Sequence, residues 1–275
     1  MWFLIISYRY NNFYRQIISF LVKGGTTLKM RPDIKVFDNA SEMAEELVEE
    51  FYRYTKELCE INQKVNIAIS GGSTPLFFYR RLASFNSISL KKIDWNKIHI
   101  FCVDERCVPP NHQDSNFGTA DKLFLRTIDI PQENIHRIQG EKEPAEETLR
   151  YSDELKSNIP LKNSYPSFDW IFLGLGEDGH TASIFPDQLN LLFSNDFCES
   201  VEHPQTKQRR ITLTGKVLIN SRRITFLIIG ETKQKAVKEI INNEPAARLY
   251  PASYIKSLGG KLEWYLDNQA AQYIK

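Results

Sequence analysis

The fold of this 275-residue chain follows from one stretch, Phe168-Asp169-Trp170-Ile171-Phe172-Leu173-Gly174-Leu175-Gly176-Glu177-Asp178-Gly179-His180. Its mostly apolar first half predicts a buried strand, and the three glycines after it let the backbone turn sharply and approach a ligand closely. An acid and a histidine then lie two residues apart, beyond the carboxyl end of a strand, where α/β proteins place their chemistry. The alternative is a tight turn into a helix with Asp178 or Thr181 as an ordinary N-cap.

Strands and helices alternate along the rest of the chain. Strands are predicted at 65–69, 98–103, 168–173, 210–214 and 224–230, and helices at 41–62, from 75, at 117–128, 143–157 and 233–241. Asn39 followed by Glu42 predicts the N-cap of the first helix, and a last strand at 262–266 is expected at a sheet edge before a final helix. This alternation predicts an α/β fold: one domain with a mostly parallel, Rossmann-like central sheet and helices on both faces.

Composition excludes several classes of protein. Hydrophobic residues make up 42% and charged residues 25% of the chain, and the formal net charge is +1. No basic excess exists to bind nucleic acid or an anionic membrane. The four cysteines form no CxxC pair, so we expect no metal site and reduced thiols in the cytoplasm.

Residues 1–32 differ from the rest of the chain, because basic residues follow an apolar start and no acid precedes Asp33. The favoured interpretation is an upstream start codon, with Met30 opening the functional polypeptide. A targeting segment is the alternative, whereas the apolar run is too short and interrupted for a membrane span. We therefore expect an N-terminal extension over 1–32 and a catalytic domain over 33–275.

A second loop suited to chemistry is Ser70-Gly71-Gly72-Ser73-Thr74-Pro75, which follows a predicted strand. Gly71 and Gly72 free successive backbone N–H groups to point at one anion, and Ser73 and Thr74 add hydroxyl donors where a helix begins. This arrangement is typical of phosphate held without a metal. No Gly-Lys-Ser/Thr follows at the required spacing, so a nucleotide P-loop is excluded. The alternative is an exposed turn with a Thr74 cap.

A third loop, Asp104-Glu105-Arg106-Cys107-Val108-Pro109, also follows a predicted strand. Clustered charges are unfavourable in a core, so we expect them to line a cleft; the alternative is a surface ion-pair cluster. Arg210 begins a later strand and Lys233 a helix. Either cation could pair with phosphate oxygens, although each alone is more simply a solvated basic residue.

Taken together, these motifs resemble the 6-phosphogluconolactonase family of the glucosamine/galactosamine-6-phosphate isomerase superfamily. The resemblance runs from about residue 34 to the end and includes Ser115-Asn116 and the tail Trp264-Tyr265-Leu266-Asp267. Related glucosamine-6-phosphate deaminases typically continue as His-Ile-Ala-Phe-Asn-Glu-Pro. This chain has His180-Thr181-Ala182-Ser183-Ile184-Phe185-Pro186, which is similar to the lactonase version.

The resemblance implies hydrolysis of the small-molecule lactone 6-phospho-D-glucono-1,5-lactone to 6-phospho-D-gluconate, without metal or organic cofactor, by a monomer or homodimer. His180 is expected to activate water, because an unperturbed imidazole has a pKa of about 6.5, and Asp178 or Glu177 to orient it. Arg106 would stabilise the oxyanion or bind sugar hydroxyls, and Asp104 would bind hydroxyls or act as a second acid/base. Phosphate would be held by Gly71, Gly72, Ser73, Thr74, Arg210 and Lys233. The rivals are a deaminase and a module that only senses sugar phosphates.

Overall fold

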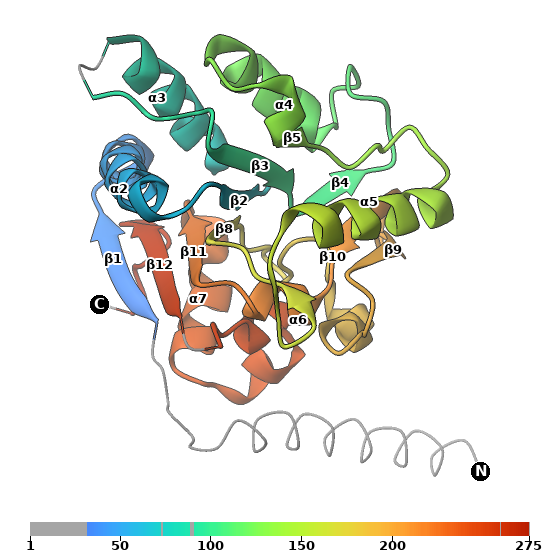
Figure 1. Ribbon diagram of the computed structural model, residues 1–275. Coiled ribbons are helices and arrows are strands. Elements are labelled where there is room, and N and C mark those ends of the chain that lie inside the picture. The colour runs from blue at the N-terminus through green and yellow to red at the C-terminus, as the bar shows by residue number, and fades with distance from the viewer. Residues whose placement is uncertain (1–31, 73, 89–90, 259, 275) are drawn as a thin grey trace. The chain divides into compact units, whose positions relative to one another are not determined.

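The computed structural model describes residues 32–72, 74–88, 91–258 and 260–274 (Figure 1). The extension expected over residues 1–32 therefore lies outside the described residues except for Pro32.

The α-helices are α2 (Ala40–Ile61), α3 (Pro75–Ile88), α4 (Asn116–Leu123), α5 (Pro144–Asn158), α6 (Gly215–Ile219) and α7 (Gln234–Ile241). Short 3-10 helices span Leu125–Thr127, Gln132–Asn134, Pro186–Leu192, Glu231–Lys233, Pro245–Leu249 and Pro251–Tyr254. The strands are β1 (Asp33–Phe37), β2 (Val65–Ile69), β3 (Ile98–Cys102), β4 (Asp104–Arg106), β5 (Ile135–His136), β6 (Leu161–Lys162), β7 (Tyr165–Pro166), β8 (Trp170–Leu173), β9 (Cys198–Glu202), β10 (Arg209–Leu213), β11 (Arg223–Ile228) and β12 (Lys261–Asp267).

The central sheet has seven strands in the order β1-β12-β11-β8-β2-β3-β5, and every neighbouring pair in it is parallel. Helices α2, α3 and α4 cover one face, and α6 and α7 lie on the other (Figure 1). The predicted parallel α/β fold is thus confirmed. From β2 the chain proceeds to β3 and β5 on one side and then returns to β8 on the other. The boundary between β2 and β8 is the topological switch point, where open α/β sheets bind ligands.

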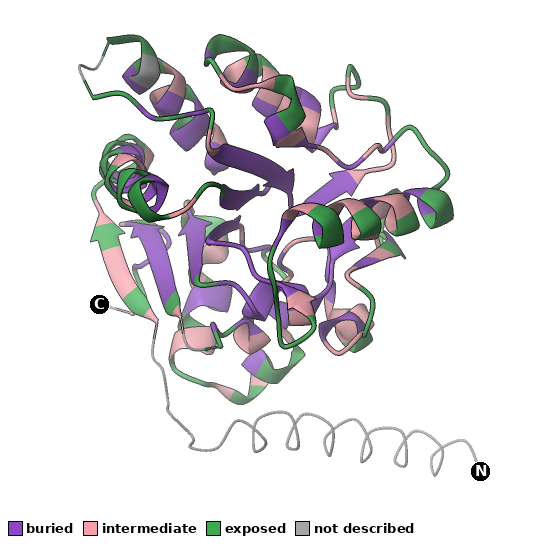
Figure 2. Ribbon diagram, viewed as in Figure 1, coloured by how far each residue is buried: buried purple, intermediate pink, exposed green. Residues whose placement is uncertain are grey.

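The central strands are buried on both faces (Figure 2). On one face, Trp170 and Phe172 of β8 pack against Phe51 of α2, with ring centroids 6.1 Å and 6.4 Å from the Phe51 ring. Burying an aromatic side chain of this size contributes roughly 1.5–3 kcal/mol. This cluster fixes β8, and hence the loop after it, against the helical layer.

Helix α2 begins where the sequence predicts. The Asn39 side chain accepts hydrogen bonds from the backbone N–H groups of Ser41 and Glu42, at 2.9 Å and 3.0 Å. The Glu42 carboxylate reaches back to accept from the Asp38 N–H at 2.7 Å. Such a cap is worth about 1 kcal/mol, and the extended backbone at Asn62 ends the helix.

The expectation for the C-terminal tail is wrong in two respects. Strand β12 lies between β1 and β11 and is not an edge strand, and residues 268–274 form turns where a final helix was expected. The pattern does not predict β1, because Asp33–Phe37 is short and has no fully buried position. Because β1 is not predicted, the sequence offers β12 only one neighbouring strand, β11, and β12 is therefore expected at the edge of the sheet.

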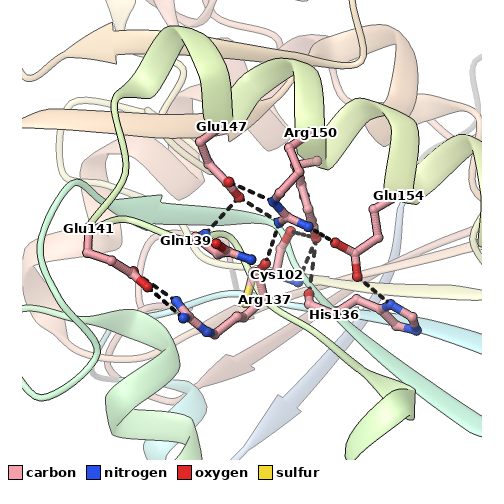
Figure 3. Close-up of polar contacts among 9 residues, drawn as sticks. Cys102, His136, Arg137, Gln139, Glu141, Glu147, Arg150 and Glu154 are labelled. Atoms are coloured by element: carbon pink, nitrogen blue, oxygen red, sulfur yellow. Dashed lines mark hydrogen bonds and ion pairs between the residues drawn. The ribbon is translucent and has the colours of Figure 1, made fainter.

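A buried polar chain joins the edge strand β5 to helix α5 (Figure 3). His99 Nδ1 lies 2.9 Å from His136 Nε2, and His136 Nδ1 lies 2.7 Å from Glu154 Oε1. Arg150 pairs with both Glu154 and Glu147. The network satisfies side chains that would otherwise be buried without partners beside the sheet edge.

We expect the stability of the protein to fall as the pH drops from about 6.5 to about 4. Burial, followed by the charges of Lys64 and His136, lowers the pKa of His99 to about 4. The unfolded chain takes up this proton near pH 6.5 and the folded chain does not, so protonation favours unfolding throughout that window.

Denaturant unfolding at several pH values measures this effect. In a His99→Asn variant, the decrease in unfolding free energy between pH 7 and pH 4 should be smaller by up to about 3 kcal/mol. An identical decrease in both proteins would contradict the assignment to His99.

Candidate active site

The three loops singled out in the sequence meet at the carboxyl ends of β2, β3 and β8. There they surround a pocket of about 170 Å³ that lies at the switch point of the sheet. Both glycines and charged side chains contribute to its lining. The lining residues are Ser70, Gly71, Gly72, Thr74, Pro75, Asp104, Arg106, Asn116, Gly174, Leu175, Gly176, His180, Ala182, Arg210 and Lys233.

Most of the residues singled out in the sequence contribute to this one pocket. Asp178 does not line it but contacts His180 from behind. Ser73 lies outside the described residues. The pocket itself is lined by His180, Asp104, Arg106, Gly71, Gly72, Thr74, Arg210 and Lys233.

His180 is held by Asp178 in a short turn. The His180 Nδ1 atom lies 2.6 Å from Asp178 Oδ1, and the His180 backbone N–H donates to the same oxygen at 3.1 Å. Burial alone would raise the pKa of Asp178, but the hydrogen bond and charge of His180 outweigh it and lower the pKa below its usual range. An ionised carboxylate only accepts, so in the neutral imidazole the proton resides on Nδ1 and Nε2 is left as the acceptor.

Two glycines make this turn feasible. A Cβ on Gly176 would lie 2.1 Å from His180 Nδ1, so a side chain there would displace the imidazole. Gly179 has φ of 80°, and a Cβ on it would strike the Tyr250 ring. Ala252 donates its N–H to the Gly179 carbonyl at 3.1 Å, so the segment around residue 250 supports the turn from behind.

Strand β4 directs its charges in two directions. Asp104 and Arg106 line the pocket, whereas Glu105 points to the opposite side and is buried. The Glu105 carboxylate accepts hydrogen bonds from Ser115 and from the backbone N–H groups of Asn116 and Phe117, which open α4. The expectation that this charged loop lines a cleft is therefore wrong for Glu105, because side chains alternate along a strand.

Two arginines face each other at the pocket. In the antiparallel pairing of β10 with β4, Arg210 is directly opposite Arg106. The Nε atoms of both are buried and have no hydrogen-bond partner. Burial, and then the charge of Arg106, lowers the pKa of Arg210. Like charges directly opposite each other destabilise a sheet, so this arrangement favours a bound anion, with Lys233 at the same pocket.

Asn116 is a pocket residue to which sequence reasoning assigned no role. Its Nδ2 donates to the Asp104 carbonyl at 3.0 Å, and it lies so close to Gly71 that a Cβ there would be 1.8 Å from Asn116 Oδ1. Asn116 therefore joins the loop after β2 to β4. The Ser115-Asn116 motif was the available signal, but only the fold places it beside Gly71.

Within the described ranges, no group of three or more histidine, cysteine, aspartate or glutamate side chains is arranged to hold a metal ion. None of the helices described is both long enough and apolar enough to span a membrane.

The fold and pocket place this chain in a class of enzymes that act on phosphorylated sugars. It belongs to the glucosamine-6-phosphate isomerases/6-phosphogluconolactonase family, whose profile matches residues 38–264. It is 42% identical over 239 residues to the 6-phosphogluconolactonase of Haemophilus influenzae, covering 86% of this chain and 98% of that protein. The 6-phosphogluconolactonase of Synechocystis sp. is 36% identical over 249 residues, covering 90% of this chain and 100% of the relative.

Solved structures agree with this placement. A crystal structure of devB protein superposes with a TM-score of 0.82 at 39% identity, covering 88% of this chain and 99% of that one. The 6-phosphogluconolactonase of Thermotoga maritima gives a TM-score of 0.74 at 28% identity, covering 86% and 99% of the two chains.

We expect the pocket to bind inorganic phosphate through Arg210, one of its two facing arginines. An Arg210→Gln variant should weaken this affinity by about tenfold, because a charged hydrogen-bond donor is removed. Isothermal titration calorimetry measures the effect.

Arg209→Gln is the matched control. Arg209 precedes Arg210 on β10, points away from the pocket and pairs with exposed Glu143. The phosphate affinity of the Arg209→Gln variant should stay within about twofold of that of the wild type. Equal weakening in both variants would show that general surface charge, and not the pocket, attracts the anion.

Proposed function

We propose that this chain hydrolyses 6-phospho-D-glucono-1,5-lactone to 6-phospho-D-gluconate. One observation carries the proposal: His180, which Asp178 holds from behind, lines the same pocket as two facing arginines. A base together with an anion site is what hydrolysis of a phosphorylated lactone requires. The relatives named 6-phosphogluconolactonase, which this chain matches over nearly their whole length, supply the substrate.

His180 acts as the general base. Its Nε2 removes a proton from a water molecule as the water oxygen attacks the lactone carbonyl, and Asp178 stabilises the imidazolium that forms. When the tetrahedral intermediate collapses, the bond between the carbonyl carbon and the ring oxygen breaks. The imidazolium then returns the proton to that ring oxygen, which becomes a hydroxyl group.

Backbone donors and charged side chains together orient the substrate. Gly71, Gly72 and Thr74 offer backbone and hydroxyl donors to the phosphate, together with Ser73, Arg210 and Lys233. Arg106 stabilises the negative charge that develops on the carbonyl oxygen, and Asp104 accepts hydrogen bonds from sugar hydroxyls. Binding the remote phosphate contributes orientation that lowers the barrier by several kcal/mol.

Deamination of an amino-sugar phosphate is the nearest alternative. A monomeric glucosamine-6-phosphate deaminase has a TM-score of 0.72 but only 18% identity, a likeness that concerns the fold alone. The sequence after His180 continues as Thr181-Ala182-Ser183 and favours the lactonase. Release of ammonia from glucosamine 6-phosphate would favour the deaminase.

We also propose that the enzyme works in the cytoplasm as a monomer or homodimer, without a nucleic-acid partner. The four cysteines are free in the structure, which is consistent with a reducing compartment. The formal net charge of +1 gives no general attraction to polyanions.

The wild-type protein should accelerate the loss of freshly prepared 6-phosphogluconolactone above its spontaneous hydrolysis. A His180→Ala variant should lower kcat by about 10²–10⁴-fold, the contribution of a positioned general base. Absence of acceleration by the wild type would overturn the proposed function, and normal turnover by the variant would overturn the role of His180.

A double variant tests the role of Asp178. If Asp178 acts through His180, the Asp178→Asn change should lower kcat in the wild type but have little further effect in His180→Ala. Additive losses would instead assign Asp178 an independent contact with the substrate.

A further inference from the structure

Ser183 lies behind the pocket and is not among its lining residues. The side chain is fully buried, and its hydroxyl donates to Asp104 Oδ2 at 2.6 Å. Asn116 Nδ2 lies 3.4 Å from the other carboxylate oxygen. Two uncharged donors therefore hold a carboxylate that is only 5% exposed.

The same carboxylate has two arginines as neighbours. Asp104 and Arg106 lie on one face of β4, and Arg210 and Thr212 lie on the matching face of β10, where Thr212 is opposite Asp104. Yet no basic nitrogen of the described residues lies within 4.0 Å of the Asp104 carboxylate. The three charged groups share a small pocket without forming an ion pair.

The backbone conformation of residues 181–184 places Ser183 beside Asp104. Ala182 has φ of 52°, a left-handed conformation that is unfavourable for a residue with a Cβ. The turn is closed by the Ile184 N–H, which donates to the Thr181 carbonyl at 3.0 Å. The Ser183 N–H donates to Thr212 Oγ1 at 3.1 Å, so β10 fixes the same residue from its other side.

We propose that Ser183 is a positioning residue whose hydroxyl holds the Asp104 carboxylate away from Arg106 and Arg210. A carboxylate left to rotate beside two half-buried arginines would pair with one of them, because charged hydrogen bonds are stronger than neutral ones. That pairing would occupy arginine donors that the phosphate or the carbonyl oxygen needs, and carboxylate acceptors that the sugar hydroxyls need. Ser183 thus keeps the anion site open.

This inference rests on the proposed function, since it concerns the same sugar-phosphate pocket, but its test does not require turnover. The probe is inorganic phosphate, titrated calorimetrically into the wild type, Ser183→Ala, Asp104→Asn and the double variant. Ser183→Ala should weaken phosphate binding by about tenfold, because Asp104 turns onto an arginine. In the double variant the affinity should return to that of Asp104→Asn, because the asparagine carries no charge to pair.

A merely structural role for Ser183 would give a different result. It would weaken phosphate binding equally in the presence and absence of the Asp104 carboxylate, and that outcome would overturn the proposal. Unchanged affinity in Ser183→Ala would overturn it as well. If Ser183→Ala fails to fold, a double variant that folds supports the proposal, and one that also fails contradicts it.

Ser167→Ala is the matched control, because Ser167 is also buried and its hydroxyl donates to the Asn220 carbonyl away from the pocket. Its phosphate affinity should equal that of the wild type. Absence of lactone turnover in the wild type would count against the proposed function alone and would leave the phosphate measurements decisive for Ser183.

Discussion

The parallel pairing of β2 with β8 is the contact on which the rest of this structure depends. Ile67 pairs with Trp170 and Ala68 with Ile171, although about a hundred residues separate the two strands. Through this pairing the loop after β2, which contains Gly71, and the loop after β8, which contains His180, lie side by side. Neither loop could form a pocket alone, so the site exists only when the sheet is complete.

Electrostatics in the pocket follow from which neighbours are charged and which are neutral. Asp178 contacts the His180 imidazole directly, and this pairing lowers the pKa of the carboxyl group. Asp104 instead has neutral hydrogen-bond partners, although arginines are near. The two carboxylates therefore differ: Asp178 has a histidine as its partner, and Asp104 has uncharged side-chain partners.

The sequence predicted the regular elements well where hydrophobic periodicity was strong. The helix after Asn39 begins within one residue of its expected position, and the strand at 65–69 agrees fully. What the pattern did not predict depends on distant partners. The edge strand β1 is recognisable only through its pairing with β12, and the inward turn of Glu105 only through the α4 backbone that it caps.

The same distinction between local patterns and distant partners applies to the residues of the candidate site. Loops that follow a strand and carry glycines, hydroxyls, acids or histidine are recognisable from a few consecutive residues. Gly71, Asp104 and His180 could therefore be singled out from sequence alone. Asn116 and Ser183 owe their importance to a single partner each, Gly71 and Asp104 respectively, which lies far away in the chain. Local patterns contain no information about such pairs.

Strands β4, β10 and β9 form a separate antiparallel sheet. It carries Asp104, Arg106 and Arg210, whereas the loops after β2 and β8 belong to the central sheet, and Val103 connects the two sheets. Its N–H donates to Ile69 in the parallel sheet, and its carbonyl accepts from Leu213 in the antiparallel one, each at 2.9 Å. His180 is thus anchored in one sheet, and Arg106 and Arg210 in the other. A shift of the antiparallel sheet would therefore move the two arginines, while the loops that carry Gly71 and His180 keep their places at the central sheet.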